Sequence, residues 1–449
     1  MNQNVKVTLF ASCTVAISET SWGYSALSGY LFDIGHDNTH VGIAEASQGI
    51  CQLIAAMVAG RMADKKSRQL PLRIGVFVGF VAIFVLWLAM YSPYATSSDT
   101  HAFWMSTLGL GVWGLFRGAT MAPLDALFAD SIATHERAKL QVWKYVATLV
   151  GATNGPILAS LLFLQVGDSW TRSELKYVIA AGTGFAAVPL VSLLFLRDKH
   201  SLGEELSGPL MGLNSNHNPQ DDDEDDDAGA TGEEEEGPSA HELLASKVRQ
   251  LCFGADALFG VASGMTVKFF PLFFRDNTHL TPAKVNMVTI VTTFLMIFGS
   301  LLAQKLAVRS SRMKVILIFK FIGIALLFIM AQFQSLWSDW RIIVPIYVAR
   351  TVLMNATAPL HKSILMDHCP KSTRGRWNAA DSIVTFGWSG SAFLGGILAD
   401  AHGFGFSFLI TAALQFVGFL LLFALVPLVR DEPAPAKPVV LAEEGEEAV

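Results

Sequence analysis

Long apolar segments recur along the chain and are separated by short polar stretches. A helix needs about 20 mainly apolar residues to cross a hydrocarbon core about 30 Å thick. The pattern therefore predicts twelve membrane-spanning helices, six before and six after a long acidic segment. Their expected ranges are 6–31, 41–62, 72–94, 103–130, 140–165, 175–196, 250–274, 284–307, 312–334, 341–366, 378–399 and 405–429.

These segments predict an all-α membrane protein whose twelve transmembrane helices form two pseudo-symmetric six-helix bundles. We expect the first bundle at residues 1–197 and the second at 248–429. Residues 198–247 are rich in Asp, Glu, Gly, Pro and Ser, a composition that predicts a disordered linker. An acidic tail is expected at 430–449. The first apolar segment is longer than the core of a signal peptide, so no cleavable signal is expected.

Composition shows where the charge lies. The 449 residues are 52% hydrophobic and 16% charged, with a formal net charge of −6. The linker and tail hold 21 of the 38 acidic residues but only 4 of the 32 basic ones. The apolar body therefore has 28 basic against 17 acidic residues. The charge of the whole chain consequently says little about its partners.

Lys and Arg gather in the loops at one end of the predicted helices, at positions such as Arg61, Lys139, Lys199 and Arg309. By the positive-inside rule, this end, both termini and the linker face the cytosol. We expect an integral multi-pass protein that works as a monomer in a lipid bilayer. Since topology explains the basic residues, no nucleic-acid partner is expected.

The two halves repeat a pattern of charged residues. In each half an Asp at the cytosolic end of a span is followed seven residues later by an Arg, with another Arg upstream inside the span. The shared order in equivalent helices favours duplication of one six-helix unit, an organisation common among transporters. The residues are Arg117, Asp130 and Arg137 in the first half, and Arg350, Asp367 and Arg374 in the second.

Three short motifs give a family resemblance. The loop after the second span, 60–68, contains Gly60, Asp64 and Arg68, the fourth span contains Arg117-Gly118, and the fifth contains 151–156 (GATNGP). These resemble the loop signature, the buried arginine and the core of the antiporter motif of the major facilitator superfamily, with Ser67 in place of one signature glycine. The resemblance covers nearly the whole chain apart from the linker and tail. It implies a secondary transporter in which helices 1, 4, 7 and 10 line a central cavity.

The loop 60–68 also has a physical interpretation, as a latch between the bundles. Gly60 permits close approach of helix ends, and Asp64 can face a helix N-terminus, where the macrodipole favours a carboxylate. We expect Asp64 to dock on the eleventh span, with Asp130 and Arg137 as alternative partners. The second-half loop 303–312 has no Asp, which predicts an asymmetric latch. Alternatively, the basic residues only enforce topology. The gating candidates are Gly60, Asp64, Lys65, Arg68, Asp130, Arg137, Asp367 and Arg374.

The motif in the fifth span has two interpretations. Gly151 and Gly155 are four residues apart and form a face of small residues on which another helix can pack closely. Pro156 adds a kink point. Helix packing explains these residues as well as a role in antiport does.

Charged residues inside spans are the main functional signal, because each costs about 2.5–3.5 kcal/mol at mid-membrane. Glu19 is the candidate proton carrier, and Arg117 is its expected partner. A fixed structural ion pair is the alternative. The predicted substrate and proton pathway comprises Glu19, Arg117, Asp256, Lys268 and Arg350.

The more central of these charges are three cations, Arg117, Lys268 and Arg350, against Glu19, which favours an anionic substrate. Two alternatives weaken this count, since Asp256 can enter the cavity and Lys268 can extend to the membrane surface. Four aromatic residues could line the cavity, although packing or lipid contact explains each of them as well. They are Trp22, Tyr24, Trp113 and Phe269.

Other chemistry has little support. Gly109, Gly111 and Gly114 match a dinucleotide fingerprint only as letters, because no strand precedes them, so we interpret them as helix packing. No phosphate-binding loop for ATP is present. The four cysteines are widely separated, which excludes a disulfide scaffold and a cysteine zinc site. We expect no enzyme activity, metal or cofactor.

The sequence therefore predicts a secondary active transporter that moves a small organic solute by alternating access. Proton coupling with efflux by antiport is the first hypothesis. A symporter or uniporter of an organic anion or other polar solute is the second. A membrane sensor or scaffold that signals through the linker without transport, and a lipid translocator, also stay open.

Overall fold

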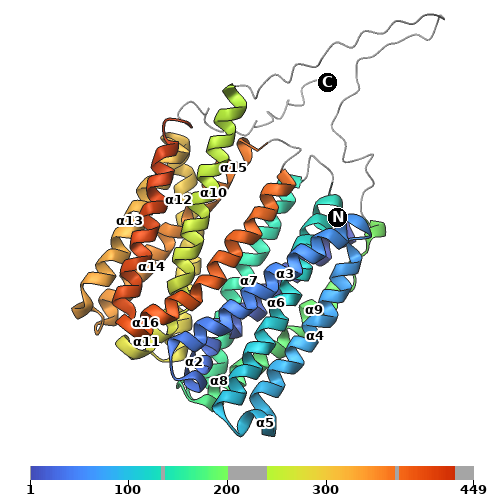
Figure 1. Ribbon diagram of the computed structural model, residues 1–449, viewed down its shortest axis with the longest axis vertical. Coiled ribbons are helices and arrows are strands. Elements are labelled where there is room, and N and C mark those ends of the chain that lie inside the picture. Colours follow the sequence, from blue (N-terminus) through green and yellow to red (C-terminus); the bar gives the residue numbers. More distant parts are fainter. Residues whose placement is uncertain (1, 133–136, 201–239, 370–373, 430–449) are drawn as a thin grey trace, which may run out of the picture. The chain divides into compact units, whose positions relative to one another are not determined.

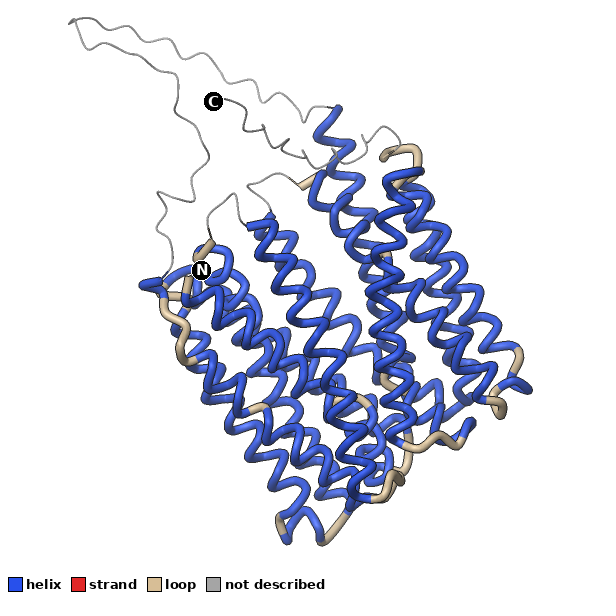
Figure 2. Tube along the Cα trace, turned by 180° about the vertical axis from the view of Figure 1, so that it is seen from behind, coloured by secondary structure: helices blue, strands red, loops and turns tan. Residues whose placement is uncertain are grey.

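The computed structural model describes residues 2–132, 137–200, 240–369 and 374–429 (Figure 1). These ranges are almost entirely helical and contain no β-strand (Figure 2). Nine helical segments of the described part are long and apolar enough to cross a membrane. One of them lies in α16 (Arg374–Leu425) and comprises two spans, because the backbone leaves helical geometry at Gly403, with φ of 79°.

The first and fourth predicted spans are more polar and complete the set. They are α1 (Gln3–Trp22) with α2 (Ser25–Gly35), and α6 (Asp99–Asp130). The predicted all-α fold of twelve spans is confirmed. Five further helices begin and end within three residues of the predicted ranges. They are α3 (Asn38–Lys65), α4 (Gln69–Tyr91), α7 (Arg137–Val166), α12 (Pro282–Arg309) and α13 (Arg312–Gln332).

Proline explains why three other spans are broken into two helices. A proline ring clashes with the carbonyl four residues earlier. Pro189, Pro271 and Pro359 each stand four residues after the last or next-to-last residue of a helix. The broken pairs are α8 (Arg172–Phe185) with α9 (Ala187–Leu193), α10 (Ala240–Val267) with α11 (Phe270–Thr278), and α14 (Trp340–Ala356) with α15 (Ala358–Asp367).

The linker prediction is wrong at its C-terminal end. Residues 240–247, expected to be disordered, form the first two turns of α10. The segment contains Ala, Glu, Leu and Lys, which favour helix, and therefore extends the seventh span. Residues 198–200 form a short 3₁₀ helix, η1 (Asp198–His200). Residues 201–239 of the predicted linker and the tail 430–449 lie outside the described residues.

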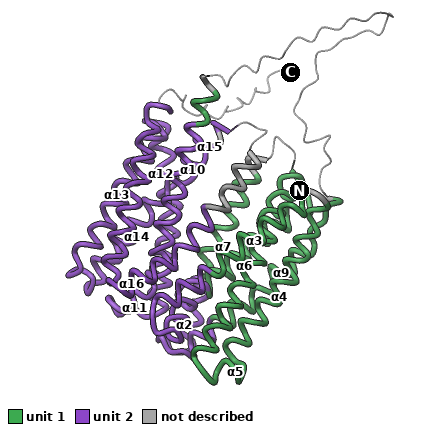
Figure 3. Tube along the Cα trace, viewed as in Figure 1, with its two compact units in different colours: residues 1–22, 47–155, 179–246 green, residues 23–46, 156–178, 247–449 purple. Residues whose placement is uncertain are grey.

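The chain divides into two compact units that do not coincide with its two halves (Figure 3). Unit 1 contains residues 1–22, 47–155 and 179–246. Unit 2 contains residues 23–46, 156–178 and 247–449. Unit 2 therefore combines two segments from the first half of the sequence with the second half.

Glycines allow close helix packing inside unit 1. A Cβ added at Gly114 or Gly118 of α6 would collide with the backbone carbonyl of Gln48 or Gln52 on α3. A Cβ at Gly109 would meet Leu86 of α4 at 2.7 Å. The prediction that the fingerprint-like glycines serve helix packing is confirmed.

Unit 2 has an aromatic core centred on α11. Phe270, Phe273 and Phe274 are fully buried, and the rings of Phe270 and Phe273 both lie 5.2 Å from that of Phe408 on α16. Because α11 follows the break before Pro271, this core fixes where the seventh span resumes. The break itself carries Lys268, one of the candidate site residues.

Candidate functional site

The expected ion pair between Glu19 and Arg117 is present in unit 1. Nε of Arg117 on α6 lies 2.9 Å from Oε1 of Glu19 on α1. The indole N–H of Trp113, one helical turn before Arg117, donates to the same carboxylate oxygen at 3.3 Å. The two charged side chains keep 22% and 26% exposure, so neither is fully buried.

The glycines of the fifth span support the backbone that carries Glu19. A Cβ added at Gly155 of α7 would lie 2.6 Å from the carbonyl oxygen of Ile17 and 2.9 Å from the nitrogen of Ser21 on α1. At Gly151 a Cβ would collide with the carbonyl oxygen of Cys13. Helix packing therefore accounts for both glycines. Pro156, which follows Gly155, lies inside α7.

The structure corrects the predicted charge count of the interior. Nζ of Lys268 lies 2.9 Å from Oε1 of Glu45 on α3, and Glu45 is only 2% exposed. Asp256 on α10 lies 3.0 Å from Nδ1 of His361 on α15. The count of three cations against one carboxylate omitted Glu45, although it lies inside the second predicted span. Of the three predicted cations, Arg350 alone has no carboxylate partner among the described residues.

Two helix N-termini in unit 2 are capped by carboxylates from the other half of the sequence. Asp400 of α16 accepts hydrogen bonds from the backbone N–H groups of Asn38 and Thr39, at the start of α3, at 2.9 and 2.7 Å. The side chains of Asn38 and Thr39 donate to the same carboxylate at 2.8 and 2.5 Å. Reciprocally, Asp168 accepts from the backbone N–H of Ala283, in the first turn of α12, at 2.8 Å.

These caps satisfy N–H groups that have no partner within their own helix, at the positive end of the helix dipole. They are reciprocal, because Asp168 follows the fifth span and caps the eighth, whereas Asp400 follows the eleventh and caps the second. Sequence reasoning missed both aspartates. The available signal was an Asp directly after a span, at the same place in each half.

Further contacts join the same segments of unit 2. A Cβ added at Gly42 of α3 would lie 2.5 Å from the carbonyl oxygen of Ala392 on α16. The hydroxyl of Ser25 on α2 donates to Asn286 of α12 at 2.8 Å. We call the contacts of residues 23–46 and 156–178 with the second half of the chain the gate. Within unit 2 the gate contacts consist of packed backbone and hydrogen bonds.

At the other ends of the helices, one ion pair occurs in each half. Arg68, next to α4, pairs with Asp130, the last residue of α6. Arg312, the first residue of α13, pairs with Asp367, the last residue of α15, at 2.7 Å. In both halves the last residue of a later helix supplies the carboxylate of this pair. The predicted asymmetry concerns Asp64, and it stays a prediction.

Of the remaining latch residues, the structure describes the surroundings of Gly60 only. A Cβ added at Gly60 would meet no atom of its own unit within 4 Å, so the expected close approach is not seen there. The side chains of Asp64, Lys65, Arg137 and Arg374 lie outside the described part of the structure. Docking of Asp64 on the eleventh span therefore stays a prediction.

The aromatic candidates pack instead of facing open space. Trp22 and Trp113 are buried, with ring centroids 5.7 Å apart in an edge-on arrangement. Phe269 is fully buried. Tyr24, at the break between α1 and α2, places its hydroxyl 3.2 Å from that of Tyr347 on α14. Two of these residues still place a polar group next to a predicted charge: Trp113 donates its indole N–H to Glu19, and the hydroxyl of Tyr24 interacts electrostatically with Arg350.

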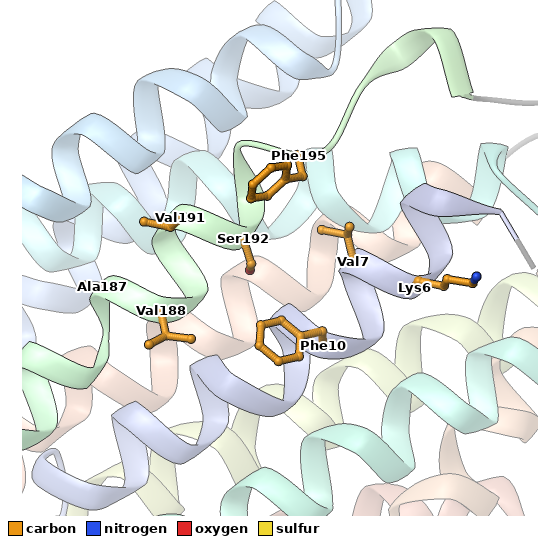
Figure 4. Close-up of a pocket in the computed structure, with 8 residues that line it drawn as sticks. All are labelled: Lys6, Val7, Phe10, Ala187, Val188, Val191, Ser192 and Phe195. Atoms are coloured by element: carbon orange, nitrogen blue, oxygen red, sulfur yellow. The ribbon is translucent and has the colours of Figure 1, made fainter.

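An apolar groove of about 690 Å³ lies between α1 and α9 of unit 1, and none of the predicted pathway residues lines it (Figure 4). Phe10 and Val188 line it and are largely exposed, as expected for a surface that faces lipid. Lys6 is the charged residue of the lining. In the described residues, no group of three His, Cys, Asp or Glu side chains is placed to hold a metal ion.

The twelve helical spans and the charges inside them define a membrane transporter and not an enzyme. The family model of the Major Facilitator Superfamily matches residues 8–249 and 252–447. The chain belongs to this superfamily. A search of curated proteins finds no match.

Solved structures similar to this chain include three transport proteins. The bacterial homologue of the iron transporter ferroportin in an inward-facing state has a TM-score of 0.65 at 13% identity, over 94% of this chain and 98% of that one. The nucleoside transporter NupG has a TM-score of 0.60 at 14% identity, over 94% of this chain and 99% of that one. The bacterial homologue of the human lysosomal transporter Spinster has a TM-score of 0.63 at 11% identity, over 96% of this chain and 98% of that one. At such low identity the likeness establishes the fold.

Proposed function

We propose that the chain is a proton-coupled secondary active transporter that moves a small organic solute by alternating access. The ion pair between Glu19 and Arg117 carries this proposal. Ionisable residues inside membrane-spanning helices mark ion or substrate pathways in most cases. Protonation of Glu19 removes the charge that holds Arg117, so a single proton changes the interaction between α1 and α6.

The gate contacts support alternating access. The two reciprocal caps consist of hydrogen bonds. A single hydrogen bond typically contributes only about 0.5–1.5 kcal/mol to stability, or about 1.5–3 kcal/mol when one of its groups is charged. Such contacts can break and re-form within a transport cycle. α1 ends at Trp22, three residues after Glu19, and the chain enters the gate at Gly23. The break between α1 and α2 therefore connects the proposed proton site to the gate.

The excess of Lys and Arg in the loops at the opposite helix ends sets the proposed orientation. In this orientation both termini and the acidic linker face the cytosol, and the gate faces the other side of the membrane. We propose that a single chain is the working unit, since each of its halves supplies a cap to the other.

Efflux by antiport, in which a proton and the solute occupy the site in turn, is the first candidate for the direction of transport. Proton symport or uniport is the second. One observation bears on the choice between them. Gly151 and Gly155, the glycines of the antiporter-like motif, are fully used in packing α7 against α1. The motif therefore adds no support for antiport beyond the resemblance itself.

A transport screen with purified protein in liposomes tests the proposal. Liposomes are loaded with a defined mixture of organic acids, amines, amino acids and nucleosides, and the retained solutes are measured with and without an imposed pH difference. We expect at least one solute to cross only when the protein is present, at a rate that depends on the pH difference. A sensor or scaffold would give no flux of any solute, and a lipid translocator would move labelled lipid instead.

A further inference from the structure

Arg350 is a buried cation that lacks an ionic partner in the described part of the chain. It is 2% exposed, and its Nε and Nη2 atoms have no hydrogen-bond partner. The other two cations predicted for the interior, Arg117 and Lys268, are paired with carboxylates. A buried charge without compensation is strongly unfavourable. An anion other than the described carboxylates would therefore compensate the charge at this position.

Three segments of unit 2 bring suitable groups to Arg350. Tyr24 lies at the break between α1 and α2, and Tyr347 stands about one helical turn before Arg350 on α14. Both tyrosines are close enough to Arg350 for electrostatic interaction, and their hydroxyls lie 3.2 Å apart. Phe270 of α11 places its ring centroid 5.8 Å from the guanidinium carbon and 4.4 Å from the ring of Tyr347.

We propose that Arg350, Tyr24 and Tyr347 form a subsite for a carboxylate group, so that the transported solute is an organic anion. This inference rests on the proposed function and specifies its substrate class. A guanidinium can donate two parallel hydrogen bonds to one carboxylate. Because the two hydroxyls share one hydrogen bond, one O–H is left free to donate a third. Phe270 supplies an apolar face for the body of the solute.

The charges around the subsite also favour a ligand with a single negative charge. Lys320 on α13 interacts electrostatically with Arg350 and Asp256. Its amine donates to the carbonyl oxygen of Met354 at 2.8 Å, which fixes it as a structural group. The negative charge of Asp256 offsets the positive charge of Lys320. The uncompensated charge at the subsite is therefore that of one guanidinium, which matches a monoanionic carboxylate.

The location of the subsite gives the bound anion a role in gating. Tyr24 belongs to the gate segment 23–46, from the first half of the sequence, whereas Tyr347 and Arg350 belong to the second half. A carboxylate that accepts from both sides connects the halves through the solute. Occupancy of the subsite is thereby linked to the state of the gate.

Thermal stability of the purified full-length chain tests the charge argument. We expect Arg350→Met to raise the melting temperature by about 2–4 °C or more, because it removes a buried charge that nothing compensates. Arg350→Lys keeps the charge and should melt close to the wild type. Arg341→Met, on the exposed first turn of the same helix, is the matched control and should leave the melting temperature unchanged. A melting temperature lowered by Arg350→Met would overturn the inference, since that is the result for a purely structural arginine.

Ligand protection tests the carboxylate. Benzoate should raise the melting temperature of the wild type and of Arg341→Met, and should have no effect on Arg350→Met. Benzamide, which has nearly the same shape without the charge, should not stabilise any of them. Equal protection of the wild type and Arg350→Met, or none of the wild type, would refute the subsite. Neither melting-temperature measurement depends on flux. A protein that binds the anion but transports nothing would therefore give the expected melting temperatures, and only the transport screen would refute the proposed function.

Discussion

Glu19→Gln is expected to reduce the gradient-driven component of solute flux to the rate measured without a pH difference. Glutamine has nearly the same shape as a protonated glutamate and can still accept the hydrogen bond from Trp113, which lies 3.3 Å from the carboxylate. Unlike the carboxylate of glutamate, its amide group does not bind or release a proton when the imposed pH difference changes. The measurement is uptake or efflux of the identified solute by proteoliposomes, with and without an imposed pH difference.

Glu174→Gln is the matched control. Glu174 belongs to the same half of the chain, but its carboxylate accepts hydrogen bonds from the backbone and side chain of Ser169 in a loop. Its replacement should preserve the dependence of flux on pH. If Glu19→Gln kept the same dependence as the control, Glu19 would be a structural partner of Arg117 and not a proton carrier.

A disulfide across the gate is expected to stop transport completely and reversibly. Thr39 and Asp400 lie in hydrogen-bond contact across the gate, so cysteines at these two positions are close enough to be joined. The experiment uses a background in which the four native cysteines are replaced. Oxidation should abolish flux by holding the gate closed, and reduction should restore it.

A cross-link of similar length within one half provides the control. Ser169, in the loop after α7, and Glu174, in the first turn of α8, are also in hydrogen-bond contact, at 2.8 Å. Both positions belong to the same gate segment, 156–178, so a disulfide there joins nothing to the second half of the chain. The gate stays free to open, and flux should continue after oxidation. Full activity of the oxidised Thr39→Cys and Asp400→Cys protein would show that the gate does not open during transport.

The spans were predictable because hydropathy and proline act over a few residues. Each apolar segment needs only its own sequence to identify it, and Pro189, Pro271 and Pro359 stand where three spans break. The start of α10 at Ala240 was not predicted. The acidic composition of the linker concealed a short run of helix-favouring residues at its end.

The partner of a charged side chain was predictable only where both charges stood in the middle of spans. Glu19 and Arg117 stood out because both are charges in the middle of spans. Lys268 stood out too, but its partner Glu45 is more than 200 positions away and was overlooked. The sequence shows that Asp400 follows a span, yet only the packing of α16 against α3 brings it to Asn38. Long-range contacts of this kind depend on the fold and not on local spacing.

The distance across the gate, measured as a function of pH, tests the central claim most directly. Spin labels are attached to cysteines at the exposed positions Ser173 and His402, one from each half of the sequence, in the background free of native cysteines. The account predicts that acidification shifts the wild-type distances toward a longer population, and that Glu19→Gln gives the same distribution at every pH. A single wild-type distribution, unchanged by pH and by the transported solute, would contradict it.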